Sequence, residues 1–203
     1  VYKRQVLTES ERYSVPELAQ MAIEGGCLWI DLCLPELSDE EIRAAIAPDV
    51  VDMCREAGVF LTIDDRPELA RDLGLHGVRL SARFFTERPS DTPLKLREEL
   101  GPEAVIGVET ADVTAVASLV PADVDFVTLP VAFTSDDRER FVERLRATGS
   151  QMPVVAQGDF TPGDCAMALA DGCNGVAVGR TITDSPDPVE AIRETIDVIQ
   201  NLG

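Results

Sequence analysis

The stretch Phe60-Leu-Thr-Ile-Asp-Asp65-Arg-Pro-Glu-Leu-Ala70, which continues through Gly74-Leu-His-Gly-Val78 to Arg79-Leu80-Ser81, decides the fold. Its apolar, β-branched start predicts a strand, its middle predicts a helix, and its end predicts a second strand. Strands that alternate with helices in this way are typical of a parallel α/β fold. Charged residues follow both predicted strands, so the same stretch indicates where chemistry can take place.

The same alternation extends outward from this stretch in both directions. Most of the apolar segments are continuous rather than alternating, as expected of strands that are covered on both faces. The predicted strands are Gln5–Thr8, Cys27–Cys33, Val59–Asp65, Gly77–Ser81, Ala104–Glu109, Asp125–Pro130, Pro153–Gly158 and Gly175–Gly179. Eight strands, each followed by a helix, predict a single-domain (β/α)8 barrel over residues 1–203. A doubly wound sheet is the alternative, because the strand at Gln5–Thr8 is weak.

Several of the intervening helices begin with a capping box. In this motif a Ser, Thr or Asp side chain accepts from the backbone three residues later, and an acidic side chain reaches back. The boxes begin at Ser14, Ser38, Asp65 and Asp187, with a looser relative at Thr161.

The composition narrows the class of protein. The formal net charge of −19 argues against nucleic acid and anionic membrane as partners. No apolar run is long enough to span a bilayer, and no basic-then-apolar leader opens the given sequence. Val1 without a preceding Met predicts that the true start is missing or processed. The five cysteines form no Cys-x-x-Cys pair, which predicts free thiols in a reducing cytoplasm. Self-association into a homo-oligomer is left open.

Charged residues at the strand exits are the candidate catalytic groups, since the site of a barrel lies at the carboxyl ends of its strands. They are Asp31, Asp64, Arg79 and Glu109. Charges at the end of apolar strands are costly unless they are paired, ligated or hydrated. Two interpretations stay open, namely a functional role such as proton transfer and ion pairs with arginine across the rim.

Glycines follow the last two predicted strands, where barrels commonly bind a phosphate on backbone N–H groups. Gly158 and Gly179 occupy these positions, and Arg180 offers a charge-assisted contact. A small phosphorylated substrate is therefore predicted, with ligand-free tight turns as the alternative.

Asp64 and Asp65 carry the oxygen ligands that Mg²⁺ prefers, although Asp65 also stands where a helix N-cap is expected. His76 is the only histidine, and it precedes a strand at the end of the barrel away from the site. Neither Lys3 nor Lys95 lies at a strand exit. Histidine acid–base chemistry and Schiff-base chemistry are therefore not expected.

Six segments carry a resemblance to a known superfamily. They are Glu24-Gly25-Gly26 with Trp29–Leu32, Ile63–Arg66 with Leu69-Ala70, Gly77–Ser81, Ile106–Glu109, Val155–Asp159 and Gly175–Val178. In order and spacing they resemble motifs of the thiamine-phosphate synthase / TenI (thiazole tautomerase) superfamily of small barrels. The resemblance implies binding of a phosphorylated thiazole or pyrimidine and a role in thiamine biosynthesis. It also implies a transferase that uses Mg²⁺, with Asp65 at a metal-binding position, or a tautomerase-like isomerase.

The chain departs from that pattern at several polar positions. The family's basic pair after the second strand is Cys33 and Pro35 here, its second metal-binding Asp falls near Phe84, and its Ser after the fifth strand is Glu109. Three predictions therefore remain: an enzyme with an altered rim, a non-catalytic paralogue that binds a phosphorylated ligand or partner, and another sugar-phosphate-type barrel lyase. The lyase would need a lysine at a strand exit.

Overall fold

The computed structural model describes residues 2–8 and 12–201, with only the backbone described at residues 2–8 and 47–48. The strands are β1 (Tyr2–Thr8), β2 (Trp29–Cys33), β3 (Phe60–Asp64), β4 (Gly77–Leu80), β5 (Val105–Glu109), β6 (Phe126–Thr128), β7 (Val154–Gly158) and β8 (Gly175–Val178). The helices are α1 (Val15–Glu24), α2 (Asp39–Glu56), α3 (Pro67–Leu73), α4 (Ala82–Glu87), α5 (Pro93–Leu100), α6 (Val113–Ser118), α7 (Ser135–Ala147), α8 (Pro162–Ala170), α9 (Arg180–Thr183) and α10 (Pro188–Gln200).

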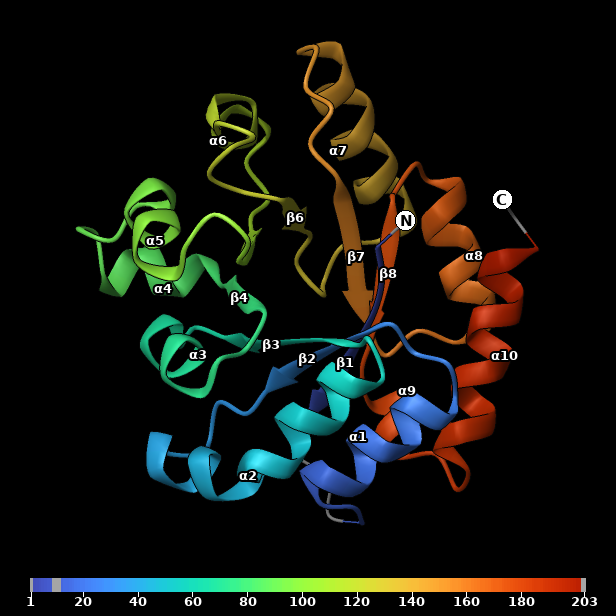
Figure 1. Cartoon of the computed structure of the whole chain (residues 1–203). Helices are drawn as coiled ribbons and strands as arrows, with labels where there is room; N and C mark the ends of the chain where they lie inside the picture. Colours follow the sequence, from blue (N-terminus) through green and yellow to red (C-terminus); the bar gives the residue numbers. More distant parts are fainter. Residues whose placement is uncertain (1, 9–11, 202–203) are drawn as a thin grey trace.

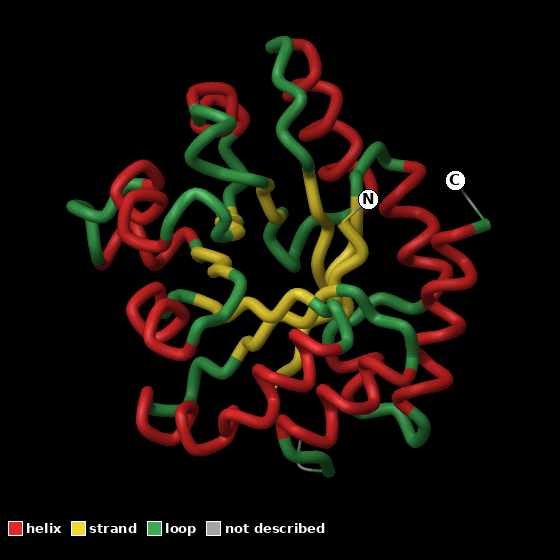
Figure 2. The backbone as a smooth tube through the Cα atoms, in the orientation of Figure 1, coloured by secondary structure: helices red, strands yellow, loops and turns green. Residues whose placement is uncertain are grey.

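The strands are parallel and follow one another around the sheet in chain order (Figures 1 and 2). Each strand pairs with the next, and β1 pairs with both β2 and β8, so the sheet closes on itself. The prediction of a parallel α/β fold is confirmed. The sequential order differs from that of a doubly wound sheet, in which the strand order reverses at a switch point.

Alternate residues of each strand serve two different cores. Ile30 and Leu32 on β2, like Leu61 and Ile63 on β3, are at most 1% exposed and pack in the main cluster of buried residues, to which the helices contribute. The residues between them belong to the opposite face of their strands and point into the barrel. Both faces of the strands are covered, and the outward-facing residues are apolar. The strands therefore appear in the sequence as continuous apolar runs.

The amino-terminal half of the barrel interior is filled by an aromatic cluster. The Trp29 and Phe126 rings meet edge to face with centroids 5.3 Å apart, and Val155 and Ala177 pack against them. Gly107 makes room for this cluster, because a Cβ there would lie 2.2 Å from the Phe126 ring. Among the side chains that the structure describes, this cluster closes the amino-terminal end of the interior, and the charged groups lie toward the carboxyl end.

The capping boxes at Ser14, Ser38 and Thr161 are present as predicted, and Asp187 accepts from the backbone of Glu190. A further box at Thr134, with Asp137, was not predicted. The box at Asp65 is wrong, since the N-cap of α3 is Arg66. Asp65 instead has a positive φ of 54°, which turns its side chain away from the helix.

Among the residues that the structure describes, no helix has both the length and the apolar character needed to cross a bilayer.

Candidate functional site

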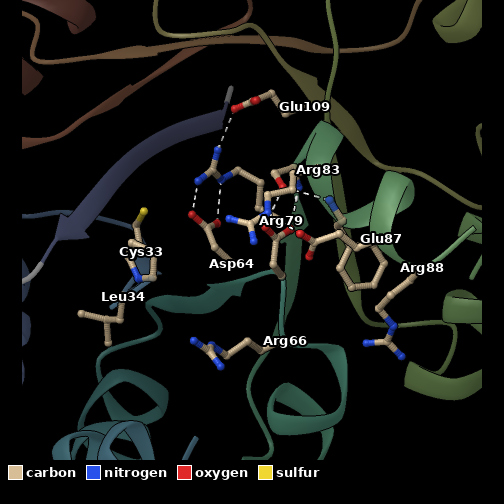
Figure 3. A pocket seen from close by; sticks show the side chains of 13 residues that line it. Cys33, Leu34, Asp64, Arg66, Arg79, Arg83, Glu87, Arg88 and Glu109 are labelled. Atoms are coloured by element: carbon tan, nitrogen blue, oxygen red, sulfur yellow. Dashed lines mark hydrogen bonds and ion pairs between the residues drawn. The ribbon is translucent and has the colours of Figure 1, made fainter. Parts of the chain in front are cut away.

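Arg79 of β4 lies at the centre of a charged cluster at the carboxyl end of the barrel (Figure 3). Its Nε donates to Asp31 at 3.1 Å and to Asp64 at 2.7 Å, and its Nη2 forms a second contact with Asp64. Its Nη1 donates to Glu109 at 3.3 Å. All four catalytic candidates are thus brought together, each from a different strand, although Asp31 is the middle residue of β2 rather than its last.

The floor of this cluster is deeply buried. Asp31 is 0% exposed and Arg79 is 7% exposed. The Thr62 hydroxyl donates to Asp31, and the Trp29 indole nitrogen donates to Thr62 at 2.9 Å. A buried carboxylate is tolerable only when its oxygens accept hydrogen bonds and an opposite charge lies close by, and Asp31 has both.

Gln157 of β7 joins the cluster from the far side of the barrel. Its Oε1 accepts from Arg79 Nη1 at 2.7 Å, and its Nε2 donates to Glu109 Oε2. Together these contacts form an interior hydrogen-bond chain, whose members in order are Trp29, Thr62, Asp31, Arg79, Gln157 and Glu109.

The pKa of Arg79 reflects two opposing causes. Burial by itself lowers the pKa, but the charges of Asp64 and Asp31 raise it, and the net direction is upward. Arg79 therefore stays charged, and four contacts from its Nε and Nη1 already use most of its donor capacity. Such a guanidinium organises its neighbours and is poorly placed to capture a phosphate.

A pocket of about 380 Å³ opens above this cluster. Asp64 and Glu109 form part of its floor, and Figure 3 shows the Arg79 guanidinium between their carboxylates. Its walls carry further arginines, namely Arg66, Arg83 and Arg88. These arginines pair with acids outside the floor, which are Asp39, Glu87, and Glu68 with Asp91, respectively.

Asp65 also lines the pocket, but its carboxylate binds the residue that follows β4 and so links the ends of β3 and β4. Its carboxylate accepts from the Ser81 backbone N–H at 2.7 Å and from the Ser81 hydroxyl at 2.6 Å. In the described part of the chain no three His, Cys, Asp or Glu side chains gather as metal ligands. With Asp64 held by Arg79 and Phe84 at the other expected position, these residues do not fit a Mg²⁺ site built by the protein.

The predicted phosphate corner lies apart from the pocket, after β7 and β8. Asp159 accepts there from the Arg180 backbone N–H at 2.8 Å and from its side chain at 3.1 and 2.9 Å. A Cβ on Gly179 would lie 2.8 Å from an Asp159 oxygen. The protein's own carboxylate thus occupies the surroundings that Gly158, Gly179 and Arg180 offer to an anion.

Other reactive groups lie outside the charged cluster or are inert. His76 precedes β4, as predicted, at the opposite end of the barrel. It accepts from the Leu61 backbone N–H through Nδ1, and its ring meets that of Phe60 edge to face. Lys95 pairs with Asp91 beside α5. All five cysteines are free, and burial together with the Asp64 charge raises the pKa of Cys33 to about 12. Cys33 is therefore a poor nucleophile at neutral pH.

Sequence reasoning missed Gln157 and Thr62, both neutral residues inside apparently continuous strands. Their signal is positional, because they stand two residues from other inward-facing side chains, Val155 and Asp64 respectively. The wall arginines were missed because they lie in the loop and helix that follow the strands.

The chain matches the family described as "Thiamine monophosphate synthase" over residues 5–182. It is similar to the thiamine-phosphate synthase of Bacteroides fragilis, with 30% identity over 203 residues that cover 94% of this chain and 96% of the relative. It is also similar to the thiamine-phosphate synthase of Natronomonas pharaonis, with 28% identity over 200 residues and coverage of 94% and 90%.

Solved structures share the fold. Thiamine phosphate pyrophosphorylase from Pyrococcus furiosus superposes with a TM-score of 0.79 at 22% identity and covers 98% of this chain and 96% of its own. Orotidine 5'-phosphate decarboxylase from Pyrococcus horikoshii gives 0.64 at 15% identity, with coverage of 97% and 99%. The family match spans most of the chain and agrees with the likeness in fold. The chain belongs to the thiamine monophosphate synthase family.

Proposed function

We propose that this chain binds a phosphorylated thiazole or pyrimidine and acts in thiamine biosynthesis or salvage, as a transferase of the thiamine-phosphate synthase kind. The supporting observation is the family match over residues 5–182, on a fold with a pocket at the carboxyl ends of β2 to β5. The working unit is a single (β/α)8 domain that comprises residues 1–203. Free cysteines suit a reducing compartment such as the cytoplasm.

In this proposal the charged cluster supplies the chemistry. Asp64 and Glu109 face the pocket and act on the ligand, while Arg79 and the buried Asp31 set their position and charge. A carboxylate next to a bound heterocycle accepts or returns a proton, and this would serve a tautomerase-like step as well as a transfer. Gly158, Gly179 and Arg180 hold a phosphate once Asp159 yields its contacts with Arg180.

The magnesium prediction rests on the relatives, because Mg²⁺-assisted departure of pyrophosphate belongs to the synthase reaction that the resemblance implies. Mg²⁺ commonly keeps several waters and uses few protein carboxylates together with substrate phosphates. Asp65 is the residue we retain for such a contact, and no step of the proposal depends on it.

A second candidate function is favoured by the self-paired rim. Arg79 pairs with three carboxylates, and Arg180 pairs with Asp159, so each charge already has a partner within the protein. A non-catalytic paralogue that binds a phosphorylated ligand or a partner would show this pattern. The lyase alternative lacks such support, since Lys95 lies on α5 and the likeness to a decarboxylase concerns the fold alone.

Titration calorimetry with thiazole phosphate and with thiamine phosphate tests the ligand. A synthase assay with the pyrimidine pyrophosphate and thiazole phosphate then tests turnover. We expect binding, and we expect Asp64→Asn and Glu109→Gln each to abolish turnover. Binding without turnover would favour the paralogue, and a folded chain that binds neither ligand would refute the proposal.

A further inference from the structure

Gln157 on β7 bridges two side chains of opposite charge. It is 6% exposed, its Oε1 accepts from Arg79, and its Nε2 donates to Glu109. A flipped amide would place donors against the guanidinium and an oxygen against the carboxylate, so these two neighbours determine the orientation of Gln157. Gln157 in turn determines which oxygen of Glu109 is held.

Glu109 lines the pocket and is held through one oxygen only. Arg79, drawn with Glu109 in Figure 3, donates to Oε2, and so does Gln157. No hydrogen bond to Oε1 is found within the described ranges 2–8 and 12–201, and the side chain is 23% exposed at the pocket. A carboxylate oxygen can only accept. The pocket therefore presents an acceptor whose place is fixed by two neighbours and whose own donor must come from water or a ligand.

The donors that line the pocket serve other acceptors. The Ser81 hydroxyl donates to Asp65. The wall arginines pair with acids outside the floor, as described above, and none of them contacts Glu109 in the described part of the chain. Arginines and carboxylates line the pocket in equal number. The direction of hydrogen bonds, rather than net charge, is therefore what distinguishes one ligand from another at Glu109.

The two kinds of ring in the proposed function differ in what they offer to such an acceptor. The nitrogen of a neutral thiazole only accepts, so it cannot pair with a carboxylate oxygen. An amino group on a pyrimidine carries N–H donors. At a partly buried site, a ligand without a donor displaces the water that served the acceptor and leaves it unsatisfied, which lowers affinity.

We infer that Glu109 is a specificity-determining residue whose Oε1 accepts a hydrogen bond from an amino group on the ligand ring, and that Gln157 is the positioning residue that keeps Oε1 available for it. The ligand class is a phosphorylated heterocycle with an N–H donor, such as an aminopyrimidine. The inference rests on the proposed function, because it presupposes that the pocket holds one of these heterocycles.

The test compares two pyrimidine phosphates that differ only in one substituent, an amino group in one and a methyl group of similar size in the other. Titration calorimetry is done at a pH where both rings are neutral. We expect the wild-type protein to bind the amino probe about tenfold more tightly. Glu109→Met, Gln157→Met and the shorter Gln157→Asn should each remove this preference. Combining Glu109→Met with Gln157→Met should add little, because both changes act through one oxygen.

Gln20→Met is the matched control. Gln20 also donates to a glutamate, Glu24 at 2.8 Å, but both residues are exposed on α1, away from the pocket. This variant should keep the preference of the wild type. The ratio of the two dissociation constants is the informative quantity, since a general loss of structure weakens both probes alike. If Gln157→Met does not fold, Gln157→Asn carries the test.

Equal binding of the two probes by the wild type overturns the inference. A preference that survives Glu109→Met overturns the role of Glu109, and one that survives both Gln157 variants overturns the role of Gln157. The titration with thiazole phosphate described above separates this inference from the proposed function. If thiazole phosphate binds and neither pyrimidine probe does, the inference alone fails. If no ligand binds to the folded chain, both fail.

Discussion

Replacing Arg79 by Met should destabilise the protein far more than the loss of an exposed ion pair. The change removes the positive charge and keeps much of the side-chain volume, so Asp31, at 0% exposure, loses its ion pair with Arg79. Removal of one member of a buried pair typically costs about 3–5 kcal/mol. A domain of this size has a free energy of unfolding of about 5–15 kcal/mol, so Arg79→Met should lose a large fraction of it.

Urea denaturation at neutral pH measures this loss, with Arg83→Met as the matched control. Arg83 also forms an ion pair, with Glu87, but its side chain is 80% exposed. Exposed pairs are screened by solvent, so the control should unfold like the wild type. Asp31→Asn in the Arg79→Met background should recover part of the loss, because it removes the buried negative charge that Arg79 offsets in the wild type.

The loss should also depend on pH. Without Arg79, a buried carboxylate has a folded-state pKa above its unfolded value, so its cost is absent at low pH and appears as pH rises. The gap between Arg79→Met and wild type should therefore narrow as pH is lowered toward about 4. If Arg79→Met and Arg83→Met unfold at the same urea concentration at neutral pH, the buried ion cluster does not behave as we argue.

Three further predictions concern other parts of the molecule. Burial and the charge of Arg55 lower the pKa of His76 below 6.5, so stability should fall as pH drops below that value, and denaturation curves of His76→Gln should lack this step. Asp159→Asn removes a negative charge beside Arg180 and should raise the affinity for inorganic phosphate about tenfold by calorimetry; unchanged affinity would place the anion elsewhere. Because burial and Asp64 raise the pKa of Cys33 to about 12, its thiol should react slowly with a disulfide reagent near pH 8, and Asp64→Asn should accelerate the reaction; equal rates in both proteins would contradict this cause.

The fold was largely predictable because buried parallel strands produce a clear signal in the sequence. Outward-facing residues such as Ile30 and Ile63 pack under helices, and the aromatic cluster makes part of the inner face apolar too, so each strand forms a clear apolar run. Even Gln5–Thr8 lies within β1. The wrong prediction concerns the start of a helix, where a local capping pattern competes with contacts made elsewhere in the fold. Asp65 does not cap α3, because its carboxylate binds Ser81 instead. A rule based on neighbouring residues cannot predict this tertiary contact.

The site was predictable as a set of strand exits but not as a set of contacts. Parallel strands bring their carboxyl ends together, and this alone placed Asp31, Asp64, Arg79 and Glu109 in one cluster. Which acid pairs with which base depends on side-chain length and on the stagger of neighbouring strands. The sequence therefore left proton transfer and ion pairing as equal options at Glu109.

The interior hydrogen-bond chain also has a consequence for how this sequence can change over time. It crosses the barrel from the aromatic cluster to the pocket. Each residue between the two ends of the chain is hydrogen-bonded to the residue before it and to the residue after it. A single substitution leaves a buried group unsatisfied, whereas a concerted replacement by apolar residues can be nearly neutral. Substituting one of these residues alone should therefore cost much stability, whereas substituting several of them together should cost little. Libraries that vary these positions together should yield folded variants that single-site scans would miss.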